Sequence, residues 1–306
     1  MQKSALNNAA GLDWDDARVF LAVARAGQFL AAARTLGLNQ ATLSRRVAAL
    51  ETALGSKLLI RRTHGSELTE AGHRLVAALE RVETEFIRAQ AAIGDHEAAL
   101  AGTVRIGAPD GFGVGFIAPR LADLVARHPG LRPQLVPVPR SFSLSKREAD
   151  VAVLVGRPDT GRLVARKLTD YTLSLYACER YLEANGRPTA PTDLARHRLV
   201  GYVDDLIPTP ALDYAREFLR NWRSDVEVSS ALGQLEAVRA GVGIGVLHDY
   251  LARPVPGLVR VLPELSATRA YWLASHESLR DLPRIRATMA FLADAVRANQ
   301  AHFTAR

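Results

Sequence analysis

The sequence contains very little cysteine and no long apolar run. Its one cysteine, Cys178, excludes a disulfide bond within the chain. No segment approaches the roughly 18 consecutive apolar residues that a membrane span needs, and residues 1–11 lack the apolar core of a secretory signal peptide. Together these absences predict a protein of the cytoplasm, where thiols stay reduced.

Signatures of common enzymes and metal sites are also missing. The sequence has no Gly-x-Ser-x-Gly elbow, no His-Glu-x-x-His pair and no phosphate-binding P-loop, and its eight histidines lack metal-ligand spacing. The segment 241–245 resembles a nucleotide-binding loop, but its third glycine comes one residue early and the segment precedes an expected strand. We therefore predict no catalytic residue, metal or cofactor, and we interpret these glycines as strand-packing residues and Cys178 as a buried apolar residue.

What is present is an ordinary globular composition with a local basic cluster. The chain has 306 residues, of which 48% are hydrophobic and 23% charged, and this length suits about two domains. The net charge of +7 favours polyanionic partners only weakly. The basic cluster lies between positions 34 and 62, where Glu51 is the only acid and the six basic residues are Arg34, Arg45, Arg46, Lys57, Arg61 and Arg62. This segment is the first candidate for a nucleic-acid surface.

The first seventy residues predict three helices and a hairpin. One helix begins after Asp13 and ends at Gly27, and a second, over 31–36, ends at Gly37. Asn39 can cap a third helix. Two short helices joined by a glycine-containing turn are typical of a helix-turn-helix. The segment that follows reads as strand, turn and strand, and the strands at 58–60 and 67–69 and the turn at 63–66 would form a wing.

The third helix would be the recognition helix, with its first turns in the major groove. Glutamine can read adenine and arginine can read guanine, whereas serine and threonine can contact bases or phosphates. The candidate DNA contacts are Gln40, Ala41, Thr42, Ser44, Arg45 and Arg46 on the helix and Arg61 and Arg62 on the wing. A generic helical module with solvated arginines fits the same pattern, and the residues alone leave that alternative open.

An apolar heptad repeat follows the predicted wing. The spacing of four and three alternates along Leu75, Leu79, Val82, Phe86, Ala89 and Ile93. Thr69 is a candidate N-cap, and the repeat fades at Gly94. We predict that this helix pairs with a second subunit, although a single amphipathic helix lying on its own domain is the alternative.

From Gly102 onward the pattern changes to alternating strands and helices. Strands are expected at 104–107, 134–136, 151–155, 173–176 and 199–202, and helices at 117–127 and 232–240. In such α/β domains ligands bind where strands end against helix N-termini. The candidate effector contacts are Asp110, Gly111, Phe112, Ser141, Phe142, Arg157, Tyr202, Ser229 and Ser230. Arg157 could pair with an effector carboxylate, but it also fits a surface charge, the serines fit helix caps, and Tyr202 fits the core.

The N-terminal motifs resemble those of LysR-type transcription regulators. The matching segments are 14–16, 19–27, 31–33, 41–46, 50–51, 54–55 and 68–72, with Leu36, Leu58 and Arg61. The resemblance implies DNA contacts from Gln40, Thr42, Ser44 and Arg45, with Arg61 on the wing. The chain departs from the family pattern at Leu30, Ala41 and Leu59, where a Ser or Thr cap, a proline and a phenylalanine are common.

Weaker motifs extend the resemblance over nearly the whole chain. They are 102–107, 119–121, 128–129, 144–150 and 240–245, while His248 stands where the family often has proline. The implied fold class is α/β overall: a winged helix-turn-helix over 1–69, a linker helix for dimerisation over 70–99 and a two-subdomain effector domain over 100–306 that resembles periplasmic binding proteins. The implied crossovers lie near Asp170 and Ala270, and the last helix, over 284–297, returns to the first subdomain.

The resemblance also implies the function and the partners. It describes a DNA-binding transcription regulator that is modulated by a small-molecule effector bound between the two subdomains. The expected partners are a two-fold double-stranded DNA site at a promoter, the effector, RNA polymerase and further copies of this chain in a homodimer or homotetramer. The alternative from a different class is a small-molecule-binding oligomer whose helical head does not bind DNA.

Overall fold

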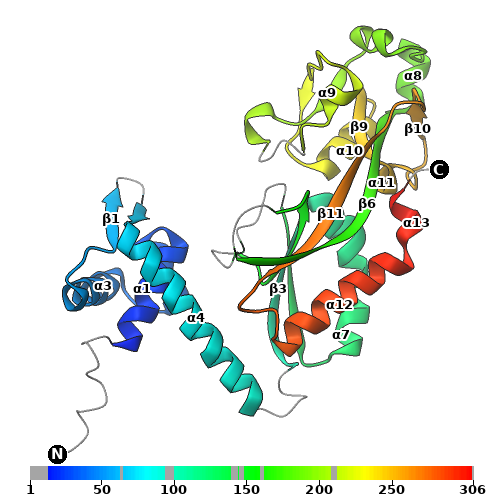
Figure 1. Ribbon diagram of the computed structural model, residues 1–306. Helices are drawn as coiled ribbons and strands as arrows, with labels where there is room; N and C mark the ends of the chain where they lie inside the picture. Colours follow the sequence, from blue (N-terminus) through cyan, green and yellow to red (C-terminus); the bar gives the residue numbers. More distant parts are fainter. Residues whose placement is uncertain are drawn as a thin grey trace, which may run out of the picture. The chain divides into compact units, whose positions relative to one another are not determined.

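The computed structural model describes residues 13–62, 65–93, 100–138, 144, 148–158, 162–207 and 212–304, without the side chains at positions 84, 87, 88 and 90–93. The chain divides into two compact units, with the boundary after Gly94 (Figure 1). We call residues 13–93 the head and residues 100–304 the sensing unit. Each unit is described by itself.

Three helices form the body of the head: α1 (Trp14–Ala26), α2 (Phe29–Leu36) and α3 (Gln40–Leu54). The predicted caps are confirmed, because Asp13 Oδ1 accepts from Asp15 N at 2.8 Å and Asn39 Oδ1 accepts from Thr42 N at 2.7 Å. Gly27 and Gly37 end their helices with positive φ angles, which glycine adopts without strain. Only the start of α2 differs from the prediction, since it begins at Phe29 without a side-chain cap.

The wing is a two-stranded antiparallel hairpin made of β1 (Leu59–Arg62) and β2 (Gly65–Leu68). Thr63 and His64 of the predicted turn lie outside the described residues. Ser66 N donates to Gly27 O at 2.8 Å, which attaches β2 to the end of α1. A Cβ atom on Gly65 would lie 2.7 Å from the same carbonyl oxygen. The hairpin therefore approaches the helices too closely for a larger residue at position 65.

The linker helix α4 (Glu70–Ile93) begins where predicted, because Thr69 Oγ1 accepts from Gly72 N at 3.0 Å. Its apolar seam is divided. Leu79 is 8% exposed and belongs to the core of the head, and Leu75 packs against that core. Val82 and Phe86 are 49% and 58% exposed. The first half of α4 therefore fits the alternative interpretation, an amphipathic helix that packs on its own domain, because the core of the head extends as far as Leu79.

The sensing unit is built on one mixed sheet of nine strands in its described part, in the order β4-β3-β5-β11-β6-β9-β7-β8, with β10 beside β6. The strands of the first half are β3 (Gly102–Ala108), β4 (Leu131–Pro137), β5 (Val151–Val155) and β6 (Leu163–Cys178). Those of the second half are β7 (Leu199–Gly201), β8 (Val226–Glu227), β9 (Ile244–His248), β10 (Leu258–Val261) and β11 (Ala267–His276). The predicted α/β architecture is confirmed.

Two long strands connect the subdomains and define the crossovers. In Figure 1, β6 (green) and β11 (orange) run side by side through the sensing unit. Asp170 pairs with Ala270, the two positions near which the resemblance implies the crossovers. β11 continues along β5 in the first subdomain, and β6 continues along β9 in the second. These two strands are therefore the hinge between the subdomains.

The helices cover this sheet. The predicted helix over 117–127 is present as a 3₁₀ turn (Ala118–Arg120) and α7 (Leu121–Arg127). The helical segment begins earlier than predicted, with α6 (Asp110–Phe112) and a π-helical turn (Gly113–Ile117), and its irregularity coincides with three glycines and a proline. The others are α8 (Glu179–Asn185), α9 (Ala215–Phe218), α10 (Ala231–Arg239), α11 (Asp249–Ala252), α12 (Pro283–Ala298) and α13 (Gln300–Phe303), with 3₁₀ turns at Pro191–Arg196 and Asp204–Leu206. The last long helix lies where predicted.

Two sequence interpretations of small residues are also settled by packing. Cys178 is buried, as expected. A Cβ atom on Gly243 would lie 2.2 Å from Arg198 O, and one on Gly245 would lie 2.7 Å from Val238 Cγ2. These glycines therefore allow β9 to pack against its neighbours and do not form a phosphate loop.

Candidate nucleic-acid interface and effector site

One face of α3 is exposed and polar. Gln40, Ala41 and Arg45 are exposed, and Ser44 is half-buried beside them. Residues four positions apart on a helix share a face, so Gln40 lies near Ser44 and Ala41 near Arg45. The opposite face carries the buried residues Leu43, Val47 and Leu50, which hold α3 in the head core. Thr42 is half-buried at the capped N-terminus.

The wing brings an arginine to this face. Arg61 Nη2 donates to Ser44 Oγ at 3.3 Å, and the Arg61 guanidinium lies 5.2 Å from the centre of the Phe29 ring. Arg61 is itself exposed. The recognition helix and the wing therefore present one continuous surface with a positive charge at its edge.

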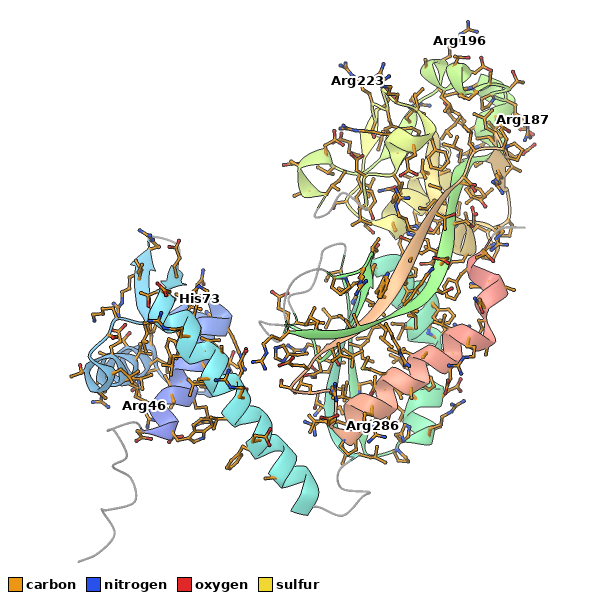
Figure 2. The ribbon with its side chains drawn as sticks, viewed as in Figure 1. Arg46, His73, Arg187, Arg196, Arg223 and Arg286 are labelled. Carbon is orange, nitrogen blue, oxygen red and sulfur yellow. The ribbon has the colours of Figure 1, made fainter. Side chains whose placement is uncertain are left out.

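The other two predicted arginine contacts are engaged within the head. Arg46, labelled in Figure 2, lies 3.6 Å from both Asp15 Oδ2 and Asp16 Oδ1 of α1, so it ties α3 to α1. Burial raises the pKa of Asp16, as do Asp13 and Asp15, whereas Arg46 lowers it. Arg62 Nε donates to Glu67 Oε2 at 2.9 Å across the hairpin. The sequence did not reveal these pairs, because they depend on tertiary contacts.

Glu51 fixes the connection between α3 and the wing. Its carboxylate is 9% exposed and accepts from Leu58 N at 2.9 Å, from Leu59 N at 3.2 Å and from Lys57 Nζ at 2.6 Å. Burial by itself raises the pKa of Glu51, but these hydrogen bonds outweigh it and leave the pKa below the usual value of 4.5. The single acid of the basic segment is therefore a structural anchor for β1.

In the sensing unit, Asp110 connects the two subdomains. It follows β3 at the start of α6 and is only 7% exposed. Its Oδ2 atom accepts from Ser230 Oγ at 2.6 Å and from Leu232 N at 3.2 Å. Ser230 is also the N-cap of α10, since its hydroxyl oxygen accepts from Gly233 N at 3.1 Å. Two predicted effector residues, 120 positions apart, thus meet at one helix N-terminus, and Ser229 lies half-buried beside them.

The neighbours of Asp110 pack tightly. A Cβ atom on Gly111 would lie 3.0 Å from Leu251 Cδ1 and 3.4 Å from Ala231 Cβ, so α6 approaches the second subdomain closely. Phe112 is fully buried, with its ring centre 4.6 Å from that of Tyr271 and 5.8 Å from that of Phe303. The structure therefore places Phe112 in an aromatic core beneath the site.

Several aromatic side chains that the sequence analysis did not select lie around Tyr202. The ring centres of Tyr202 and Tyr214 are 6.2 Å apart, and His248 stacks on Tyr171 at 5.2 Å. Burial lowers the pKa of His248 to about 4, although Asp110 and Asp249 act in the opposite direction. This imidazole is therefore neutral at pH 7. Its position at the end of strand β9 was the available signal, and it was noted only as a departure from proline.

The remaining predicted effector residues are not among the residues that contact Asp110 or surround Tyr202 in the described structure. Arg157 is exposed, and its guanidinium lies 5.8 Å from the centre of the Trp272 ring. Ser141 and Phe142, with the neighbouring Arg140, lie outside the described residues. At the hinge, Asp249 accepts hydrogen bonds from Thr172 Oγ1, Ser174 Oγ and Tyr176 Oη, an arrangement that the sequence analysis missed.

Some classes of site do not occur in the part of the chain that the structure describes. There, no group of three or more His, Cys, Asp or Glu side chains is placed to hold a metal ion. No described helix is both long and apolar enough to cross a membrane. The described surfaces are thus a polar helix-and-wing face and a polar, aromatic site between two subdomains.

A winged helix-turn-helix head followed by a hinged α/β unit defines a ligand-responsive DNA-binding regulator. Family models agree. Residues 14–73 match the bacterial regulatory helix-turn-helix of the lysR family, and residues 97–297 match the LysR substrate binding domain. The chain belongs to the LysR family. It is a transcription regulator whose head binds DNA and whose C-terminal domain binds a small-molecule effector between two subdomains, and it is not an enzyme.

Curated relatives carry regulator names. The transcriptional regulator PtxR of Pseudomonas aeruginosa is 30% identical over 290 residues, which are 93% of each chain. A regulator of Xanthomonas campestris pv. campestris is 36% identical over 186 residues, and the match spans 61% of this chain and about half (54%) of that protein. Membership of the family removes the alternative of a head that serves oligomerisation alone.

Solved structures share the fold. ArgP from Mycobacterium tuberculosis matches with a TM-score of 0.67 at 19% identity, over 93% of this chain and 97% of that one. A variant of full-length OxyR from Pseudomonas aeruginosa matches with a TM-score of 0.64 at 22% identity, over 92% of this chain and 96% of that one. At these identities the likeness concerns the fold.

Proposed function

We propose that α3 enters the major groove of a promoter through Gln40, Ala41, Thr42, Ser44 and Arg45, while Arg61 and Arg62 of the wing contact the DNA backbone or the minor groove. The single observation that carries this assignment is the hydrogen bond between Arg61 and Ser44, since it places the helix and the wing on one exposed surface. Arg46 acts mainly inside the head, because Asp15 and Asp16 hold its guanidinium. The domain limits we propose are 1–69, 70–99 and 100–306.

Three arginine variants separate these roles. Arg45→Ala should relax base preference by about 1–3 kcal/mol, whereas Arg61→Ala should weaken all sequences alike and reduce the salt dependence. Arg46→Ala should lower the stability of the head and leave base preference unchanged. The measurement is binding to the promoter and to scrambled DNA at several salt concentrations. Equal affinity of all three variants and the parent for every DNA would refute the proposed interface.

We also propose that the far half of α4 pairs two copies of the chain, which then bind a two-fold promoter site. Val82 and Phe86 are large apolar residues that the head leaves exposed. A homodimer follows from one such contact, and a homotetramer would need a second interface.

Phe86→Asp tests this pairing, because a carboxylate cannot be buried cheaply in an apolar seam. We expect the variant to sediment as a monomer and to bind DNA poorly. His73→Asp places the same charge on an exposed part of the same helix (labelled in Figure 2) and should leave the assembly unchanged. A dimer of unaltered stability in Phe86→Asp would exclude this seam.

The effector site proposed here lies between the subdomains, around Asp110, Gly111, Tyr202, Ser229 and Ser230. Phe112 supports it from below, and Arg157, Ser141 and Phe142 remain candidate contacts at its edge. We also propose that the promoter-bound protein contacts RNA polymerase. We propose the cytoplasm as its location. Footprinting of the purified protein upstream of its own gene, with and without a panel of small molecules, tests operator and effector together.

A further inference from the structure

The charge of the effector site can be derived from Asp110. A helix N-terminus is a position where proteins commonly bind the carboxylate or phosphate of a ligand. At the N-terminus of α10 that position already holds the Asp110 carboxylate, which accepts from Ser230 Oγ and from Leu232 N. A ligand carboxylate brought to the same place would meet a second negative charge at close range, which costs free energy in a buried site.

Within the described ranges, Asp110 accepts hydrogen bonds from neutral groups only. Among the described residues, both of its hydrogen bonds end on Oδ2 and no arginine or lysine forms an ion pair with it. A carboxylate that is 7% exposed normally has a cation or several donors around it. Both donors that contact Asp110 are neutral, so its negative charge is not neutralised by the residues that bind it.

The pocket beside Tyr202 also contains more acidic than basic residues in its described lining. Tyr202, Tyr214, Trp222 and Gln234 of the second subdomain line it and Asp110 does not, and the charged residues among its described lining are Asp204, Asp213 and Arg216. Arg216 Nε lies 3.5 Å from Asp213 Oδ2, so the one positive charge of the wall is already paired. Burial raises the pKa of Tyr202, and the charge of Asp110 raises it further.

The polar atoms around the site can accept hydrogen bonds. Tyr214 and Tyr171 are buried, and within the described residues their hydroxyl groups have only the neighbouring phenols of Tyr202 and Tyr271 near them, without a hydrogen bond of good geometry. A phenol oxygen accepts from an N–H group, and its ring attracts a cation. Gln234 donates through Nε2 to Val228 O at 2.9 Å, which leaves its amide oxygen to act as an acceptor. His248 adds no positive charge at pH 7, because it is neutral there.

We infer that the effector of this protein is an organic cation, a small molecule with an ammonium group that pairs with Asp110 and packs against the rings of Tyr202 and Tyr214. The inference rests on the proposed effector site between the subdomains. Asp110 is then the residue that determines specificity, because it selects amines and rejects carboxylates of the same shape.

The test is a titration of the full-length protein with matched pairs of probes. Each pair has one skeleton and opposite charge, such as phenethylamine with 3-phenylpropionate and 1,4-diaminobutane with succinate. We expect the amines to bind and the carboxylates to fail. Asp110→Asn should weaken amine binding at least about tenfold, because a charged hydrogen bond in a buried site is lost. Asp294→Asn, an exposed acid on α12, should change nothing.

A second variant distinguishes the loss of the Asp110 charge from misfolding of Asp110→Asn. Ser230→Ala removes the hydroxyl that donates to Asp110 but keeps the carboxylate charge, so it should retain the preference for amines. If carboxylates bind the parent and Asp110→Asn with the same affinity, the inference is wrong, although the proposed effector site still stands. Absence of binding by both series would overturn the inference too, whereas loss of promoter binding without any ligand concerns the head and the proposed DNA interface alone.

Discussion

The strongest local prediction concerns the carboxylate that anchors the wing. Glu51→Ala removes the carboxylate oxygen that accepts from Leu58 N and Leu59 N and leaves two buried donors beside Leu58, which is 1% exposed. An unsatisfied buried donor costs about 1–3 kcal/mol, and the salt bridge to Lys57 adds little because that lysine is exposed. We expect the free energy of unfolding of the head to fall by roughly 2–4 kcal/mol. Arg61 then loses its fixed position beside α3.

The sign of the pH dependence follows from the lowered pKa of Glu51. A carboxylate whose pKa is depressed in the folded state stabilises the fold above its unfolded value of 4.5 and loses this contribution as the pH falls through the folded value. The difference between the parent and Glu51→Gln should therefore be full at pH 7 and shrink as the pH drops below the ordinary glutamate range.

Hydrogen–deuterium exchange measures this opening at the Leu58 and Leu59 amides of the full chain, after correction for intrinsic rates. Glu67→Ala is the matched control, since it removes an exposed acid from the same hairpin and should cost less than about 1 kcal/mol. Equal protection of Leu58 and Leu59 in Glu51→Ala and Glu67→Ala would refute the anchoring role of Glu51.

Two further predictions concern the hinge of the sensing unit. Burial holds the pKa of His248 at about 4, against the usual 6.5. Between these two pH values the unfolded chain binds one more proton than the folded chain, so the free energy of unfolding falls as the pH drops from about 6.5 to about 4. Urea unfolding should show a loss of up to roughly 3 kcal/mol over this range in the parent and not in His248→Gln. Asp249 accepts from three hydroxyl groups of β6, and Asp249→Asn should lower the free energy of unfolding by roughly 2–3 kcal/mol, while Asp294→Asn should leave the urea midpoint in place. A midpoint shared by the parent and Asp249→Asn would rule out the hinge role.

The head could be predicted closely because its signals are local. Asp13 and Asn39 cap helices from adjacent positions, and Gly27 and Gly37 end helices through their own backbone angles. The partners of Arg46 depend on how α3 crosses α1, which no local pattern contains. For that reason the sequence placed Arg46 with Arg45 among the candidate DNA contacts, whereas in the structure Arg45 is exposed and Arg46 is half-buried beside Asp15 and Asp16.

The same distinction applies to the linker helix and the sensing unit. A heptad pattern identifies the apolar face of α4 but not the molecule that covers it, so Leu79 and Phe86 look equivalent in the sequence and differ in exposure. Apolar runs predicted the strands β3 to β7 of the sensing unit, whereas the crossover positions were implied by the family resemblance. These runs could not predict that Asp110 meets Ser230 across 120 residues, because that contact exists only after both subdomains have folded.

That contact also constrains how an effector can act. A ligand shifts an equilibrium only through its different affinity for the two states. In the described arrangement Asp110 Oδ2 joins α6 to α10 through two protein donors, Ser230 Oγ and Leu232 N. An ammonium group that pairs with the carboxylate while Oδ2 keeps its two donors adds a contact to this state and stabilises it. A ligand that displaces Ser230 and Leu232 from Asp110 would instead favour separation of the subdomains. The two cases differ in the sign of the ligand effect on amide exchange at Leu232, which should slow on amine binding if the bridge persists.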